Sequence, residues 1–239
     1  MSSYSYDIGD WTNFQPYLLQ LEQEGKLTRT FRRLDPQRQQ AVLNAILDEA
    51  AEKGPAALNI KEVARRARVS VGSLYQYFPS RDGLLDFAIE LCVRFSSGIF
   101  QEYRPVLAAM PLEEALNAYL LGALEWGRTA AGLVRFFGRA AYQGDPVLAE
   151  RVVRPVATQM RETVQEMLAQ AAQRGEIRPD VDGEAAARLV NALFIAIGDS
   201  QLLPYLNTYF QVSDESISPE RVNTALVKFI LRGIGASAG

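Results

Sequence analysis

Hydrophobic residues recur with the period of an α-helix along almost the whole chain, and no segment alternates as a β-strand does. In the first 35 residues, Trp11, Phe14, Leu18 and Leu21 share one helical face, and Gly25 ends the run. This spacing predicts a short amphipathic helix within an N-terminal extension. The expected fold class is all-α.

Three shorter helical segments follow the extension, each with a local start signal. Asp35 and Pro36 suit the N-cap and first position of a helix that ends before Gly54. Asn59 suits the N-cap of the second, with Glu62 in a capping-box position. Ser70 can cap a third, very short helix that is expected over 71–77.

Longer helices are predicted for the rest of the chain. One is expected from Arg81 to about Tyr103. Beyond Pro111 the pattern predicts helices near 112–127, 129–142, 146–173, 183–203 and 218–233. Pro155 falls inside one of them and predicts a kink there, because proline lacks the N–H that the helix needs.

Charge is segregated along the chain. The 239 residues carry a net charge of −3, yet the stretch from Lys26 to Arg81 holds eleven basic and five acidic residues, a net +6. A basic segment joined to an acidic remainder is typical of a phosphate-binding module attached to a second function. An ordinary solvated surface is the alternative, but it does not by itself explain the segregation.

The residue types indicate which chemistries to expect. The chain has no histidine, and its single cysteine, Cys92, cannot form an intrachain disulfide. Metal-ligand spacings, a phosphate loop and a GxGxxG motif are all missing from the sequence. We therefore expect no enzyme activity, no cofactor and no metal site, although a carboxylate-only enzyme remains conceivable.

The sequence also indicates a location in the cell. Residues 1–10 have neither the basic nor the apolar part of a secretory signal. The longest apolar stretches, 116–126 and 189–197, are too short to span a bilayer. We expect a cytoplasmic protein without a membrane partner.

Residues 59–78 hold the most informative pattern: two short helices joined by a tight turn. They are expected to pack through small and branched residues, namely Ala64, Ala67, Val69 and Leu74. The second helix is expected to expose Val71, Gly72, Ser73, Tyr75, Gln76 and Tyr77. This arrangement inserts a helix into the DNA major groove, which is about 12 Å wide. The alternative for Tyr75 and Tyr77 is packing between helices.

The run from Asn59 to Leu85, NIKEVARRARVSVGSLYQYFPSRDGLL, resembles the DNA-binding region of the tetracycline-repressor (TetR) family. The resemblance is carried by the core Val-Ser-x-Gly-Ser-Leu-Tyr-x-Tyr-Phe, followed by a basic residue and Leu-Leu. It implies that Tyr75 and Tyr77 contact phosphates or bases and that Arg81 holds a phosphate. The DNA-binding residues it implies are Asn59, Lys61, Ser70, Val71, Gly72, Ser73, Tyr75, Gln76, Tyr77 and Arg81.

Two features depart from the family pattern. Arg68 stands in the turn where the family usually has glycine, which puts the turn geometry in question and adds a candidate phosphate contact. The extension before Asp35 is also unusual. We expect its basic segment, Lys26 to Arg33, to be a disordered or loosely helical tail, with entry into a minor groove as the alternative.

The resemblance implies a homodimer built through the last two long helices. Their apolar faces include Leu189, Leu193, Ile197, Leu226, Phe229 and Ile230. A dimer would present two recognition helices about 34 Å apart to a pseudo-palindromic operator. A monomeric core would show much the same pattern.

Aromatic residues are frequent between Phe95 and Tyr142, as in the wall of a small-molecule pocket. The candidate effector-binding residues are Tyr119, Trp126, Phe137 and Tyr142, with Arg135 or Arg139 as a polar anchor. The expected effector is a small apolar or aromatic molecule. A plain helical core is the alternative for each of these residues.

These observations predict an N-terminal extension (1–35), a helix-turn-helix DNA-binding domain (36–80) and a helical effector-binding and dimerisation domain (81–239). The expected function is a sequence-specific transcriptional regulator, a repressor that binds double-stranded DNA as a homodimer and is released by a small molecule. One alternative is an effector-binding or scaffold protein with a vestigial DNA-binding head. Another is an activator that uses the same head.

Overall fold

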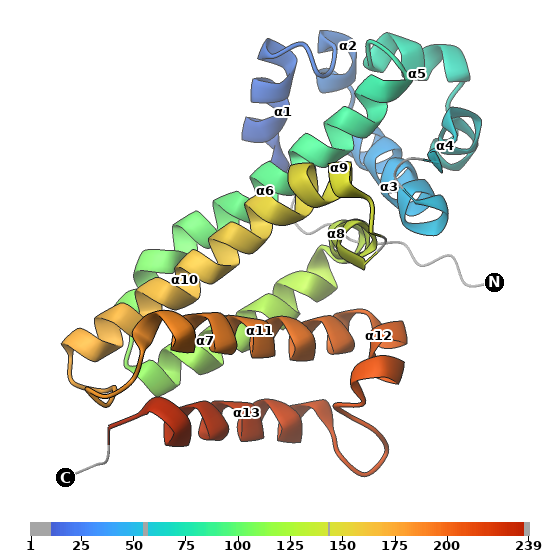
Figure 1. Ribbon diagram of the computed structural model, residues 1–239. Helices are drawn as coiled ribbons and strands as arrows, with labels where there is room; N and C mark the ends of the chain where they lie inside the picture. Colours follow the sequence, from blue (N-terminus) through green and yellow to red (C-terminus); the bar gives the residue numbers. More distant parts are fainter. Residues whose placement is uncertain (1–10, 55–56, 143, 237–239) are drawn as a thin grey trace. The chain divides into compact units, whose positions relative to one another are not determined.

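A computed structural model describes residues 11–54, 57–142 and 144–236 (Figure 1). In the described residues the regular structure is helical, apart from an isolated β-bridge between Ile177 and Gly235. The all-α fold class is therefore confirmed. The chain forms two compact units, one from residues 1–97 and 129–156 and the other from residues 98–128 and 157–239.

The first unit contains the N-terminal helices and a later segment of the chain. Its elements are η1 (Trp11–Phe14), α1 (Gln15–Gln23), α2 (Arg29–Arg32), α3 (Pro36–Lys53), α4 (Ile60–Ala67), α5 (Val71–Tyr77), the first part of α6 (Arg81–Ala109), α8 (Ala131–Tyr142), α9 (Pro146–Leu148) and the π-turn η3 (Ala149–Val153). Asp35 caps α3 by accepting a hydrogen bond from the Arg38 N–H at 3.0 Å, as its sequence position predicts.

Helix α3 is the central element of the first unit. It packs against α4 and also against α8, which is far from it in sequence. Val42 and Ile46 are fully buried on its core side. At Gly132 of α8, a Cβ would lie 3.3 Å from the Leu47 side chain, so the absence of a side chain permits the close approach of α8.

The N-terminal extension is an ordered part of the first unit. Phe14, Leu18 and Leu21 are fully buried, as their helical spacing predicts, while the side chain of Trp11 lies outside the described residues. The segment Lys26 to Arg33 is not the loose tail expected from the sequence. Leu27 and Phe31 are buried, and they anchor α2.

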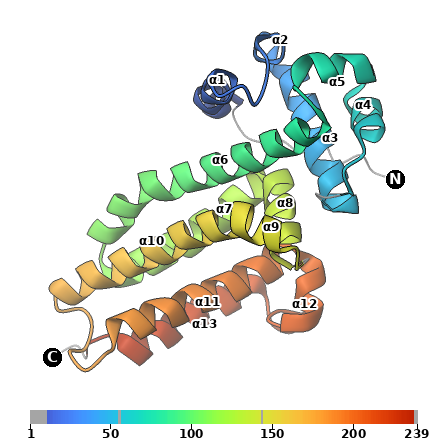
Figure 2. The same cartoon turned by 45° about the horizontal axis from the view of Figure 1, so that its top comes forward.

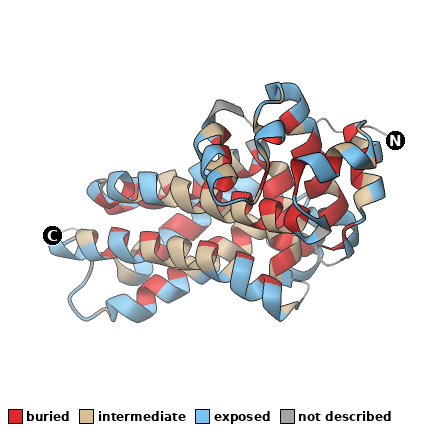
Figure 3. Ribbon diagram, turned by 90° about the horizontal axis from the view of Figure 1, so that it is seen from above, coloured by how far each residue is buried: buried red, intermediate tan, exposed pale blue. Residues whose placement is uncertain are grey.

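The second unit is a helical bundle (Figure 2). It consists of the remainder of α6 with α7 (Leu112–Thr129), α10 (Arg154–Gln173), α11 (Gly183–Leu202), α12 (Pro204–Phe210) and α13 (Pro219–Ile234), each for the residues within the unit. Its core is built from side chains such as Leu116 of α7, Val164 of α10, Phe194 of α11 and Leu226 of α13. Most helices show one buried stripe and one exposed face (Figure 3).

Prolines account for the main differences from the predicted helix boundaries. Helix α6 continues through Pro105 to Ala109 rather than ending near Tyr103. Pro204 begins α12 in a segment expected only to break the chain. The irregularity predicted at Pro155 takes the form of a π-turn just before it, since Pro155 cannot donate a backbone hydrogen bond.

None of the described helices combines the length and apolar character needed to cross a membrane.

Candidate nucleic-acid interface and effector site

Helices α4 and α5 form a helix-turn-helix whose ends are held by their own side chains. The Asn59 side chain accepts a hydrogen bond from the Lys61 N–H at 3.0 Å and caps α4. The Ser70 hydroxyl accepts one from the Ser73 N–H at 2.9 Å and caps α5. Leu74 is fully buried and fixes the inner face of α5. Because the signals are local, the positions of both helices follow directly from the sequence.

The turn between the two helices depends on a left-handed residue. Arg68 ends α4 with φ 55° and ψ 42°, the conformation that glycine adopts most easily. The turn therefore has the backbone conformation expected for the family's glycine, although the residue here is arginine. Arg68 is exposed, so its guanidinium remains available to solvent beside α5.

The outer face of the motif presents most of the side chains expected there. Lys61, Ser70, Gly72, Tyr75 and Gln76 are exposed. Asn59 is exposed too, whereas Val71 and Ser73 are partly buried. The side chain of Arg81 lies outside the described residues. Of the expected DNA-facing residues whose side chains are described, all except Tyr77 are therefore at least partly accessible on α4, the turn and α5.

Tyr77 is buried, so the expectation that α5 exposes it is wrong. Its ring packs against Phe31 with a centroid separation of 5.8 Å and against Phe78 with one of 6.5 Å. Phe31 also contacts Phe78 and Phe87 in the same cluster. The alternative of packing between helices applies to Tyr77 and not to Tyr75, which is 52% exposed.

Ion pairs separate the basic residues of the first unit into two classes. Arg65 pairs with Glu62 at 2.8 Å, Arg66 with Glu52 at 2.6 Å, and Arg32 with Glu22. Among the described residues, no carboxylate lies within ion-pair distance of Lys61, Arg68, Arg29 or Arg33. These last four exposed cations carry the uncompensated positive charge that phosphates attract.

Arg66 ties α4 to α3 and thereby positions the motif. Besides Glu52, it approaches the buried carboxylate of Glu49 at 3.3 Å. The hydrogen bonds from Arg66 lower the pKa of Glu52 from its ordinary value. An arginine committed to two carboxylates is a structural element, which the charge count along the sequence could not reveal.

A second ion pair joins α3 to α8. Arg135 donates to an oxygen of Asp48 at 2.9 Å, and both side chains are half-buried. Burial raises the pKa of Asp48, while the positive charge of Arg135 opposes that shift. Arg135 was expected as an effector anchor, and this pair gives it a partner within the protein.

The candidate effector residues are divided between the two units. Arg135, Phe137, Arg139 and Tyr142 lie on α8 in the first unit, whereas Tyr119 and Trp126 lie on α7 in the second. Tyr142 is 44% exposed. The structure thus brings Tyr119 and Trp126 onto one helix without establishing a single six-residue site.

Tyr119 is a buried aromatic residue of the second unit with an unsatisfied polar group. Its ring lies 5.0 Å from that of Phe194 and 6.3 Å from that of Phe100. The side chain is buried, yet its hydroxyl has no hydrogen-bond partner among the described residues. Burial raises the pKa of this hydroxyl, so it stays protonated and can donate. Buried polar groups are normally satisfied, so a bound molecule is one way to supply the missing partner.

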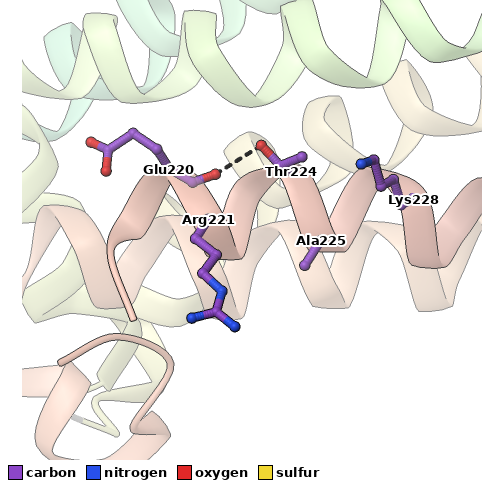
Figure 4. A pocket seen from close by; sticks show the side chains of 5 residues that line it. All are labelled: Glu220, Arg221, Thr224, Ala225 and Lys228. Carbon is purple, nitrogen blue, oxygen red and sulfur yellow. Dashed lines mark hydrogen bonds between the residues drawn. The ribbon is translucent and has the colours of Figure 1, made fainter. Parts of the chain in front are cut away.

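Two surface hollows also lie in the second unit. A cavity of about 510 Å³ is lined by residues such as Leu168, Ile177 and Arg178, and by none of the expected effector residues. A shallow depression follows α13 and is lined by Glu220, Arg221, Thr224, Ala225 and Lys228 (Figure 4). All five of these residues come from one helix, which leaves the opposite side of the depression open.

Two family models match the chain. Residues 42–87 match the model described as bacterial regulatory proteins, tetR family. Residues 110–196 match the model described as tetracyclin repressor-like, C-terminal domain. The first match includes α4, α5 and the turn between them, and the second includes Tyr119 and Phe194.

A curated relative and several solved structures are similar over most of the chain. The HTH-type transcriptional repressor KstR of Mycobacterium tuberculosis is 28% identical over 180 residues, which cover 75% of this chain and 76% of that protein. A TetR family transcriptional regulator from Chloroflexus aurantiacus shares the fold with a TM-score of 0.64, at 20% identity, covering 88% of this chain and 99% of that one.

SmeT, the repressor of the Stenotrophomonas maltophilia multidrug efflux pump SmeDEF, shares the fold with a TM-score of 0.60 at 15% identity. That match covers 84% of this chain and 91% of SmeT. The two family models, the similarity to KstR and the helix-turn-helix geometry agree with one another. The chain belongs to the tetR family of bacterial regulatory proteins and is a DNA-binding transcriptional regulator.

Proposed function

We propose that this protein is a repressor that binds a pseudo-palindromic operator as a homodimer and leaves it when a small molecule binds the second unit. The observation that carries the proposal is the exposed face of α5 with its two flanking cations, Lys61 and Arg68. Neither cation has a described carboxylate within ion-pair distance. KstR, a relative over three quarters of the chain, is itself named a repressor.

The side chains on this face suit different parts of a duplex. Gln76 and Ser73 can exchange hydrogen bonds with base edges, and exposed Gly72 lets the backbone approach closely. Tyr75, Lys61 and Arg68 suit phosphates, which fix the register without reading sequence. Arg81 begins α6, and its role rests on the family resemblance.

Exposed residues on α11 and α13 support the homodimer. Of the six apolar residues expected at the interface, Ile197, Leu226 and Ile230 are buried within the unit, and Leu193 is half-buried. Leu189 and Phe229 are 66% and 67% exposed and remain available for a partner. The depression on α13 lies between two rows of side chains spaced four residues apart, Glu220, Thr224 and Lys228 in one row and Arg221 and Ala225 in the other (Figure 4). A groove between such rows is where the side chains of a neighbouring helix pack.

The surroundings of Tyr119 support an aromatic or apolar effector with one hydrogen-bonding group. Phe100 and Phe194 offer ring surfaces, and the Tyr119 hydroxyl offers the polar contact. SmeT has been solved as a complex with triclosan, so a protein of this fold holds a small molecule. A coupling of about 1–3 kcal/mol between the two sites lowers operator affinity roughly 5- to 150-fold.

The experiment is a release assay on the DNA that the protein selects. A fluorescein-labelled duplex, recovered by the protein from sheared genomic DNA, is bound at near-physiological salt and titrated with triclosan and a panel of hydroxylated aromatics. At least one compound should lower duplex affinity in the wild type by about fivefold or more, and by much less in Tyr119→Phe. A panel that never changes duplex affinity counts against ligand-relieved repression.

A further inference from the structure

The N-terminal extension meets the recognition helix at its C-terminal end. Helices α2 and α5 lie side by side in both views of the first unit (Figures 1 and 2). The backbone N–H of Thr28 donates to the carbonyl of Tyr77 at 2.9 Å. Its hydroxyl donates to the carbonyl of Gln76 at 2.6 Å. Thr28 therefore satisfies two of the carbonyls that the end of a helix leaves without intrahelical partners.

Several further contacts keep α2 in place. Thr28 also caps α2, and Phe31 is buried against Tyr77, Phe78 and Phe87. The buried Gln39 of α3 donates to the carbonyls of Phe31 at 3.2 Å and Arg32 at 2.8 Å. The backbone of α2 is thus fixed to both α5 and α3.

This attachment places two arginines on one exposed surface. The Arg33 N–H donates to the carbonyl of Arg29 at 3.0 Å, so the two residues are one helical turn apart and share a face. Both side chains are exposed, and no described carboxylate lies within ion-pair distance of either. Neighbouring Arg32 differs, because Glu22 neutralises it.

We infer that Arg29 and Arg33 form a second DNA-backbone site, which binds phosphates beside those contacted by α4 and α5. Thr28 is the positioning residue that holds this site in register with the recognition helix. The inference rests on the DNA-binding function proposed above and extends its footprint to a part of the chain outside the matched helix-turn-helix model. The two guanidinium groups suit phosphate oxygens through bidentate hydrogen bonds.

The test is the salt dependence of duplex binding by the full chain. Affinity for the recovered duplex and for a mixed-sequence duplex of equal length is measured from low to physiological salt. The variant Arg29→Gln/Arg33→Gln should weaken binding to both. Its plot of log affinity against log salt should be shallower by about 0.9 for each phosphate that the protein no longer neutralises, and thus by about 1.8 per protomer.

The matched control is Arg128→Gln/Arg154→Gln, which removes the same charge from exposed arginines that carry nearby carboxylates. Its slope should equal that of the wild type. If the Arg29/Arg33 variant also has the wild-type slope, the second site does not exist. If the wild type binds neither duplex, the proposed function itself fails, so the two failures are distinguishable.

A second pair of variants tests the role of Thr28. Thr28→Val removes the hydroxyl, and with it both the hydrogen bond to Gln76 and the cap of α2, and should lower affinity for the recovered duplex about fivefold or more. Thr28→Ser keeps the hydroxyl and should restore the affinity. Equal affinity of Thr28→Val, Thr28→Ser and the wild type, with unchanged circular dichroism, would show that Thr28 does not position the site.

Discussion

Phe31 in the N-terminal extension and Tyr77 at the end of the recognition helix lie with their ring centroids 5.8 Å apart. Phe31 is fully buried, and Tyr77 is 8% exposed. The same cluster continues to Phe87 in α6. The extension, the recognition helix and the start of α6 therefore share one aromatic core, and we expect a change in the buried residues of the extension to affect the DNA-binding surface.

Truncating Phe31 tests this shared core. Phe31→Ala should lower the free energy of unfolding of the first unit by about 3–5 kcal/mol, because it removes buried area and leaves a cavity. Urea denaturation followed by circular dichroism measures the loss. Leu19→Ala, at a 46% exposed position of α1, is the control and should change stability little. Equal effects of the two substitutions would show that the extension is not part of the core.

Arg68 combines strain in the turn with a candidate phosphate contact. Arg68→Gly should raise the free energy of unfolding by up to about 1 kcal/mol, since glycine tolerates φ 55°. The same variant should weaken duplex binding and reduce the salt slope by about 0.9 per protomer.

Two further variants separate these effects. Arg68→Gln should show the weaker binding without the gain in stability. Gln211→Gly, at a left-handed position (φ 51°) in the second unit, should show the gain without the weaker binding. If Arg68→Gly binds the duplex as the wild type does, Arg68 has only a structural role.

A comparison of protein stability with effector affinity decides whether Arg135 has a structural role or binds the effector. If its role is the ion pair with Asp48, a double-mutant cycle of Arg135→Gln and Asp48→Asn should give a coupling of about 0.2–1 kcal/mol in unfolding. Effector affinity, measured by calorimetry on Arg135→Gln, should then remain unchanged. A loss of effector affinity with no coupling to Asp48 would instead make Arg135 the polar anchor.

Tyr119→Phe separates stability from ligand binding. A buried hydroxyl without a partner costs about 1–3 kcal/mol, so its removal should leave the ligand-free protein as stable or more stable. The same change should weaken an effector that accepts a hydrogen bond from Tyr119. Thermal unfolding with and without the effector measures both quantities. A clear loss of stability in the ligand-free variant would show that the hydroxyl already has a structural partner.

Local signals made much of the fold predictable. Asp35, Asn59 and Ser70 each cap a helix through a backbone group two or three residues away, so the sequence alone locates α3, α4 and α5. The sequence also indicated that Arg68 lies in the turn in place of the family's usual glycine, and the structure shows that this residue is left-handed where α4 ends.

Long-range contacts could not be predicted in the same way. Helix α2 has only four residues, and it is held by a bond from Thr28 to Gln76, which lies 48 positions away. The burial of Tyr77 has the same origin, because its partner Phe31 lies in the extension. The net positive charge was visible along the chain, but only the geometry shows that Arg66 serves Glu49 and Glu52 rather than a ligand.

The most direct test of the central claim is to incubate the purified protein with sheared genomic DNA at near-physiological salt and to sequence the retained fragments. A homodimer that presents two α5 helices should enrich a short pseudo-palindrome with half-sites about one helical turn apart. Retention without sequence preference, or no retention, would contradict a sequence-specific regulator and leave the helix-turn-helix as a nonspecific or vestigial element.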